Sequence, residues 1–150
     1  LDPDSQHLES KFSDQPDVVL ADPLQISQVV HNLLENVLSH AAGFSRILIS
    51  TETSTDGVTC SIADDGQGIP QKDLSQIFQR FYRVDKGRSR QSGGTGLGLS
   101  IVKHIINQHG GTIDARSQQG RGTTISFFLP YPQKRLERSL RDRMANELMT

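Results

Sequence analysis

The chain has 150 residues, enough for one domain with a real hydrophobic core. Its formal charge of -1 indicates neither a nucleic acid nor an anionic membrane as the main partner. No stretch approaches the roughly 18 consecutive apolar residues of a membrane span. The single cysteine, Cys60, excludes an internal disulfide and is typical of a reducing compartment. We therefore expect a cytoplasmic domain.

The beginning of the chain predicts a linker, a short strand and a long helix. The chain starts at Leu1 without a methionine, so we expect a piece of a longer protein, and membrane anchoring of that parent stays open. Residues 1–16 are polar and are expected to form a linker or an edge strand, and the apolar run 18–20 predicts a strand. Asp22 and Pro23 suit the N-cap and first position of a helix, whose apolar residues then recur at helical spacing.

Two hairpins and two more helices follow in the predicted order. Alternating apolar residues predict a strand from Ile47, a turn at Asp56-Gly57 and a return strand that ends at Asp64, with Cys60 at a buried strand position. A short helix is then predicted at residues 72–79, a basic loop at 81–95 and a further helix at 97–109. The two strands of a second hairpin are predicted at residues 112–117 and 123–129.

Strands that come as hairpins, rather than alternating singly with helices, predict an α+β fold. We expect a two-layer α/β sandwich in which about three helices cover one face of a mixed, mostly antiparallel sheet. The globular domain is expected to span residues 17–131. The charged remainder carries an apolar residue every four positions from Leu136 to Leu148, so residues 132–150 are expected to form a tail that is either helical or disordered.

A glycine-rich run directly precedes the second long helix. Four of the six residues from Gly93 to Gly98 are glycine. Glycine lets the backbone approach a ligand closely, and a helix N-terminus offers free N–H groups, so the run predicts an anion site, most often for phosphate. Leu99 stands where a P-loop has its lysine and where a dinucleotide fingerprint has its third glycine, which argues against both motifs. A flexible hinge without a ligand is the alternative.

Two further patterns point to a nucleotide. Asp64 ends a predicted strand and is followed by Gly66 and Gly68; because a carboxylate only accepts hydrogen bonds, it could read the exocyclic amine of adenine. The alternative is an acidic calcium-type turn or a plain β-turn. Asn32 and Asn36 lie on one helix face and offer amide oxygens suited to Mg²⁺, although two surface asparagines would show the same spacing.

These motifs, with Phe78-x-x-Phe81-Tyr82 between the glycine patterns, resemble the four boxes of sensor histidine kinase catalytic domains over residues 17 to about 130. The resemblance implies the Bergerat fold shared with gyrase-type ATPases, Hsp90 and MutL, and binding of ATP with Mg²⁺. It implies transfer of the γ-phosphate to a histidine on a separate dimerisation domain, a response regulator as a partner, and a homodimeric parent of which this fragment alone is a monomer.

The resemblance also assigns roles to single residues. Asp64 is expected to read adenine with support from Thr123, and Asn36 is the expected Mg²⁺ ligand with Asn32 beside it. Phe78 is expected to anchor a lid together with Phe81, although plain core residues would show the same pattern. The complete set of expected nucleotide-binding residues is Asn32, Asn36, His40, Asp64, Gly66, Gly68, Ile69, Arg83, Gly94, Thr95, Gly96, Leu97, Gly98, Leu99 and Thr123.

One position separates a kinase from an ATPase. Asn32 stands where gyrase-type enzymes have a glutamate that activates water, and an asparagine is not a general base near neutral pH. Asn32 is therefore the one candidate catalytic residue, and we expect phosphoryl transfer rather than efficient hydrolysis. Glu35 is expected to point off the asparagine face. A gyrase- or MutL-type ATPase and a degenerate nucleotide-binding interaction module are the alternatives.

Three departures from the family pattern carry further expectations. Ser39 replaces a usual lysine or arginine, which weakens the charge compensation of the phosphates unless basic residues of the loop, such as Arg83, restore it. His40 replaces a usual aromatic residue and either stacks on adenine or is simply exposed. No histidine has the context of a phosphoacceptor, so this chain is expected to be the ATP-binding half. The loop 81–95 is expected to be poorly ordered without nucleotide.

Overall fold

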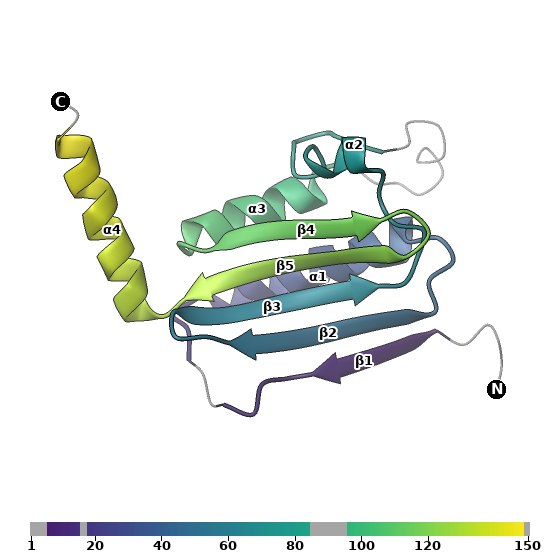
Figure 1. The fold of residues 1–150 in the computed structure, drawn as a ribbon, viewed down its shortest axis with the longest axis horizontal. Helices are drawn as coiled ribbons and strands as arrows, with labels where there is room; N and C mark the ends of the chain where they lie inside the picture. The colour runs from purple at the N-terminus through teal and green to yellow at the C-terminus, as the bar shows by residue number, and fades with distance from the viewer. Residues whose placement is uncertain (1–5, 16–17, 85–95, 149–150) are drawn as a thin grey trace.

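The structure is a computed structural model that describes residues 6–15, 18–84 and 96–148. Within these ranges, five strands form one open sheet in the order β1-β2-β3-β5-β4 (Figure 1). The strands are β1 (His7–Lys11), β2 (Arg46–Thr53), β3 (Gly57–Asp64), β4 (Thr112–Gln118) and β5 (Gly122–Pro130). The helices are α1 (Pro23–His40), α2 (Gln71–Leu74), α3 (Gly98–Gln108) and α4 (Pro132–Glu147).

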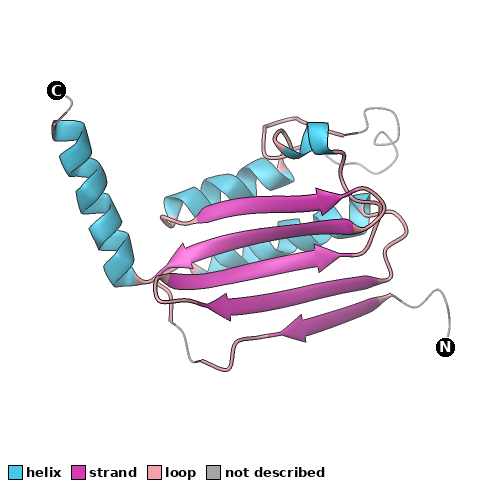
Figure 2. Cartoon of the chain, in the orientation of Figure 1, coloured by secondary structure: helices cyan, strands magenta, loops and turns pink. Residues whose placement is uncertain are grey.

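The two layers are the sheet and a pair of helices behind it. Figure 2 shows α1 and α3 on one face of the sheet, with the short α2 near one end. β1 pairs with β2 in parallel, and every other pairing is antiparallel. The predicted α+β sandwich with a mixed, mostly antiparallel sheet is therefore confirmed.

The start of α1 is set by a side-chain cap and by a buried histidine. The Asp22 carboxylate accepts hydrogen bonds from the backbone N–H groups of Leu24 at 2.9 Å and Gln25 at 3.2 Å. His109 is buried at the end of α3, and its Nε2 accepts from the Asp22 N–H at 3.1 Å while Nδ1 lies 2.7 Å from the Ile105 carbonyl. Because the backbone N–H only donates, the imidazole carries its hydrogen on Nδ1 and ties the two helices together.

The core lies between the helices and the inner face of the sheet. Alternate positions of the central strands point toward the helices, which is why the predicted period of two residues holds there. The buried apolar residues that meet in this cluster are Val29, Leu33, Val37, Ile47, Ile62, Val102, Ile105, Ile106, Ile125, Phe127 and Leu129. Among the described helices, none is long and apolar enough to cross a membrane.

The N-terminal edge strand lies within residues 1–16, for which an edge strand was one of the two expectations, and not at residues 18–20. Residues 18–20, predicted as a strand, have no regular structure, and Val18 is 80 % exposed. The edge strand is instead β1, whose residues are all exposed. Backbone hydrogen bonds to one neighbour hold an edge strand, so β1 needs no buried apolar face. The pairing with β2 is therefore what places the edge strand at residues 7–11.

One further element differs in extent from the prediction, and the C-terminal tail takes the helical one of its two expected forms. α2 covers Gln71–Leu74, and residues 75–80 form turns rather than continuing the helix to residue 79. Beyond the sheet the chain forms α4, which projects away from it in Figure 1. The described residues of α4 include no buried side chain.

Cys60 is expected to be nearly inert in the folded protein. It packs against the core from β3, and burial raises its pKa from 9.0 to about 11. The thiolate is the reactive form of a cysteine. Raising the pKa from 9.0 to about 11 lowers the fraction of Cys60 present as thiolate about 100-fold at any pH well below 9. Alkylation with iodoacetamide at pH 8, followed by mass spectrometry, should be about two orders of magnitude slower in native than in urea-unfolded protein. Equal rates would contradict this burial.

Candidate functional site

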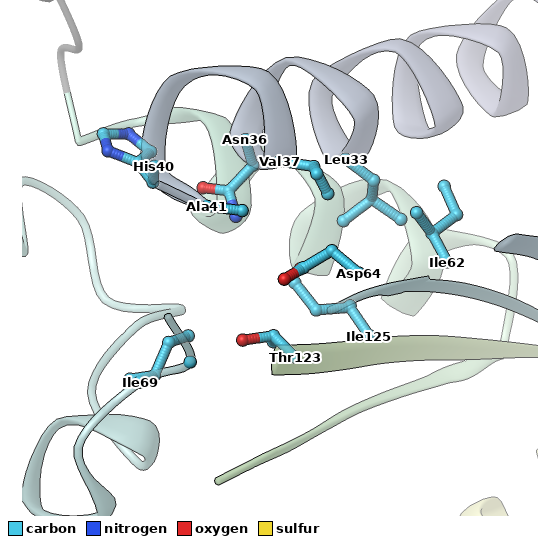
Figure 3. Close-up of a pocket in the computed structure, with 11 residues that line it drawn as sticks. Leu33, Asn36, Val37, His40, Ala41, Ile62, Asp64, Ile69, Thr123 and Ile125 are labelled. Atoms are coloured by element: carbon cyan, nitrogen blue, oxygen red, sulfur yellow. The ribbon is translucent and has the colours of Figure 1, made fainter. Parts of the chain in front are cut away.

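A pocket lies between the C-terminal half of α1, the end of β3 and the beginning of β5 (Figure 3). Asp64 is the last residue of β3, and Thr123 is its partner in register on β5. Figure 3 shows the Asp64 carboxylate and the Thr123 hydroxyl pointing into the same space, toward which Asn36 extends from α1. The lining residues are Leu33, Asn36, Val37, His40, Ala41, Ile62, Asp64, Gly68, Ile69, Thr123 and Ile125.

The polar floor of this pocket is the half-buried carboxylate of Asp64. Its Oδ1 accepts the backbone N–H of Gly66 at 2.9 Å. Desolvation by burial raises the pKa of Asp64, and the nearby negative charge of Asp65 raises it further. Hydrogen bonds from the backbone of Gly66 and Thr123 lower the pKa but do not cancel the rise. The carboxylate is therefore held by donors on the protein side and presents its remaining acceptor capacity to the pocket.

The turn after β3 requires both of its glycines. A Cβ at Gly66 would lie 3.0 Å from the Cβ of Ala41 and 3.0 Å from Oδ1 of Asp64. Gly68 has a φ of +72°, and a Cβ there would lie 2.3 Å from the carbonyl oxygen of Gln118. The first glycine keeps space beside the carboxylate, and the second lets the turn pass over the β4–β5 hairpin.

The side chains on either side of Gly66, those of Asp65 and Gln67, anchor the turn and do not line the pocket. Asp65 accepts from the Ser45 hydroxyl at 2.6 Å and from the Arg46 N–H at 2.9 Å. Slight desolvation raises the pKa of Asp65, but these bonds outweigh it and leave the pKa lowered. Gln67 Nε2 donates to the His40 carbonyl at 2.9 Å, which joins the turn to the end of α1. The sequence reasoning missed both roles, because neither residue type is specific for such an anchor.

The two asparagines of α1 have different surroundings. Asn36 lines the pocket, as expected for a residue that meets a ligand there. Asn32 instead has its Nδ2 3.5 Å from the carbonyl oxygen of Gly98, at the first residue of α3. Glu35 is exposed and lies 3.7 Å from Nε2 of His31, so it points away from the pocket as expected.

His40 lines the pocket, and the charge of Arg83 acts on it. His40 is the last residue of α1 and lines the pocket while remaining exposed to solvent. Partial desolvation, followed by the positive charge of Arg83, lowers the pKa of His40. The lowered pKa favours the neutral imidazole near pH 7, and among the described residues Arg83 is a cation close enough to His40 to act on it.

The expected glycine run is described only at its C-terminal end. Gly94 and Thr95 lie outside the described residues, as does most of the loop 81–95 that was expected to be poorly ordered. Gly96, with a φ of +71°, accepts the Phe81 N–H at 3.0 Å. Leu97 and Gly98 begin α3, and Leu99 packs against the core. These four residues do not line the pocket.

The two phenylalanines of the third motif do not behave alike. Phe78 packs against the core, which agrees with an anchoring role. Phe81 is 72 % exposed and has a φ of +64°, so the expectation that it anchors a lid is wrong for this structure. Its backbone, and not its ring, makes the contact with Gly96: the Phe81 N–H donates to the Gly96 carbonyl, and a Cβ on Gly96 would lie 3.0 Å from the Cα of Phe81. The neighbouring Tyr82 hydroxyl instead donates to the buried carboxylate of Asp73.

Comparisons with known proteins agree with this geometry. The family model described as "Histidine kinase-, DNA gyrase B-, and HSP90-like ATPase" matches residues 21–133. Sensor histidine kinase WalK of Bacillus subtilis (strain 168) is 41% identical over 133 residues, which cover 86% of this chain and 22% of that protein. Sensor protein kinase WalK of Staphylococcus haemolyticus is 42% identical over 111 residues, covering 73% of this chain and 18% of the relative. The chain thus spans about a fifth of the length of these curated relatives.

Solved structures show the same likeness over most of their length. The structure of the mycobacterial sensor histidine kinase MprB has a TM-score of 0.69 at 30% identity, covering 82% of this chain and 83% of that one. The nucleotide-free catalytic domain of histidine kinase ThkA has a TM-score of 0.69 at 31% identity, covering 85% of this chain and 80% of that one. The chain therefore belongs to the family of histidine kinase-, DNA gyrase B- and HSP90-like ATPases, as an ATP-binding domain of the sensor histidine kinase type.

Proposed function

We propose that this chain binds ATP with Mg²⁺ and presents the γ-phosphate to a histidine on a separate dimerisation domain of its parent. The observation that carries the proposal is the half-buried Asp64 carboxylate in the pocket, fixed on its protein side by the N–H of Gly66. A fixed acceptor in a pocket whose remaining lining is mostly apolar, with Asn36, His40 and Thr123 as its other polar side chains, suits the exocyclic amine of adenine.

The pocket suits a magnesium ion that the nucleotide brings with it. Asn36 lines the pocket and offers a neutral amide oxygen. Among the described residues, no group of three or more His, Cys, Asp or Glu side chains could hold a metal ion. Mg²⁺ typically takes one or two protein oxygens and completes its shell with phosphates and water, so this donor set fits it. When bound, the ion would neutralise phosphate charge.

The protein's own groups favour transfer over hydrolysis. Asn32 cannot take a proton from water near neutral pH, and Glu35 faces His31 rather than the pocket. Catalysis then consists of positioning and charge compensation, as in other phosphoryl transfers. Because His40 is neutral and Ser39 carries no charge, Arg83 is the described cation placed to assist. We further propose a cytoplasmic domain in a homodimeric parent that passes its phosphoryl group to a response regulator.

Phosphoryl transfer tests this function directly. This chain, mixed with a separately expressed histidine-bearing dimerisation domain of a related kinase and with γ-labelled Mg-ATP, should place an acid-labile label on that domain. Without Mg²⁺ the label should be lost, and Glu35→Gln should transfer as well as wild type. Sustained phosphate release by the isolated chain, abolished by Glu35→Gln, would instead show a hydrolase that uses Glu35 as its general base.

A further inference from the structure

A serine outside the pocket lining connects two walls of the site. Ser117 lies near the end of the edge strand β4, in register with Thr123 and on the same face of the sheet. Its Oγ is 2.7 Å from the backbone nitrogen of Ile69, 2.9 Å from the carbonyl oxygen of Gly122 and 2.8 Å from Oγ1 of Thr123. Both Ile69 and Thr123 line the pocket, so this one hydroxyl contacts two of its walls.

The hydrogens of this cluster can be assigned by counting. A serine hydroxyl has one hydrogen and two lone pairs. The Ile69 N–H only donates and occupies one lone pair, while the Gly122 carbonyl only accepts and takes the hydrogen. The second lone pair is then left for the Thr123 hydroxyl, which must donate to Ser117. In the opposite arrangement the Gly122 carbonyl oxygen would face a hydroxyl oxygen at 2.9 Å without a hydrogen between them.

This assignment decides what Thr123 offers a ligand. Since its hydrogen is directed to Ser117, Oγ1 of Thr123 presents only lone pairs to the pocket, beside the Asp64 carboxylate (Figure 3). The polar wall therefore consists of two acceptor groups. An exocyclic amino group has two N–H donors and matches such a wall, whereas a carbonyl at the same place on a 6-oxopurine meets two acceptors.

We infer that Ser117 is a positioning residue that sets base specificity, by taking up the hydrogen of Thr123 and so making the wall of the pocket accept only. The inference rests on the proposed binding of ATP. Removing the Ser117 hydroxyl frees the hydrogen of Thr123, which can then donate into the pocket. The variant should lose affinity for a 6-aminopurine nucleotide and discriminate less against a 6-oxopurine one.

Titration calorimetry with Mg-ATP and with Mg-ITP tests the inference. Wild type should bind ATP more tightly than ITP, and Ser117→Ala should reduce the ratio of the two affinities about tenfold. This is the effect expected when one hydrogen bond, that between Oγ1 of Thr123 and the exocyclic amine, is lost. Ser117→Thr retains the hydroxyl and should restore the ratio. In a Thr123→Val background the serine has no hydrogen to take up, so Ser117→Ala should then leave the ratio unchanged.

Ser126 provides the matched control. It is a half-buried serine of β5 that bonds Ser61 at 2.8 Å on the opposite face of the sheet, so Ser126→Ala should not change the ATP/ITP ratio. Thermal unfolding shows whether each variant is folded; if Ser117→Ala is not, Ser117→Cys is titrated in its place. Wild type that bound no ATP would overturn the proposed function and the inference together. ATP binding with a ratio that Ser117→Ala does not alter, or an equal change in the Thr123→Val background, would overturn the inference alone.

Discussion

Asp64→Asn is expected to weaken Mg-ATP binding by about 100-fold in titration calorimetry while leaving the protein folded. The substitution replaces an acceptor-only carboxylate by an amide that must direct a donor either at the Gly66 N–H or at the base. Losing a charge-assisted hydrogen bond to a buried group costs about 2–3 kcal/mol, and each 1.4 kcal/mol is about tenfold in affinity. Because the change is nearly isosteric, the melting temperature should shift by only a few degrees.

The neighbouring carboxylate is the control for this experiment. Asp65→Asn makes the same chemical change one residue away, at an exposed side chain that bonds Ser45 and Arg46 instead of facing the pocket. It should leave ATP affinity within about twofold of wild type, since no group that faces the base is altered. Equal losses in the two variants would show that the affinity depends on the shape of the turn and not on the Asp64 acceptor.

The pH dependence of binding follows from the same group. A raised pKa means that Asp64 takes up its proton at a higher pH than an ordinary carboxyl does. Binding through the ionised form should therefore decline, as pH falls, earlier than a pKa of 3.8 would require. The phosphates of ATP titrate identically in both proteins, so the ratio of wild-type to Asp64→Asn affinities isolates the contribution of Asp64. A ratio that stayed constant down to pH 4 would exclude the raised pKa.

Gly122→Ala is expected to be the most destabilising single-methyl change in the described chain near the site, by about 3–5 kcal/mol in urea unfolding. Gly122 has a φ of +104°, and a Cβ there would lie 1.9 Å from the carbonyl oxygen of Asp64 and 2.8 Å from the Cα of Asp65. Both obstacles are backbone atoms, which cannot rotate aside. The β3–β5 pairing must open at Asp64 and Thr123 to admit the methyl group.

Gly120 separates this clash from backbone strain. It also has a positive φ, +77°, but a Cβ there meets nothing within 4 Å. Gly120→Ala therefore introduces only the strain of a left-handed alanine, about 1–2 kcal/mol. Because the clash in Gly122→Ala involves Asp64 itself, that variant should also lose ATP affinity under conditions where it is still folded, whereas Gly120→Ala should bind normally. Equal destabilisation by the two changes would show that the hairpin relaxes without cost at Gly122.

Local signals explain what could be predicted of the fold. The cap at Asp22, the helical spacing along α1 and the Asp56-Gly57 turn each act through neighbours in the sequence, and all three are present in the structure. The strand expected at 18–20 was wrong because a run of three apolar residues does not reveal whether a partner strand is available. The polar β1 forms because β2 leaves one edge open for parallel pairing.

The candidate site divides in the same way. Asp64, with its two glycines, and Asn36 were predictable because residue type and spacing carry their chemistry, and the structure places Asp64 and Asn36 in one pocket. The surroundings of Asn32 and Phe81 could not be predicted from residue type and spacing. Asn32 contacts the Gly98 carbonyl and the backbone of Phe81 contacts Gly96, so both depend on how the chain enters α3.

By itself, the sequence determined the two long helices that cover the sheet, the two hairpins and the position of the acidic residue at the end of β3, because each depends on groups close together along the chain. Only the tertiary structure decided which hydroxyls and amides meet around that carboxylate. Ser117 contacts Ile69, 48 positions earlier in the chain, through a hydrogen bond that exists because β4 and β5 pair in one register and the glycine turn passes over their hairpin. A shift of one residue in that register would turn Ser117 to the other face of the sheet.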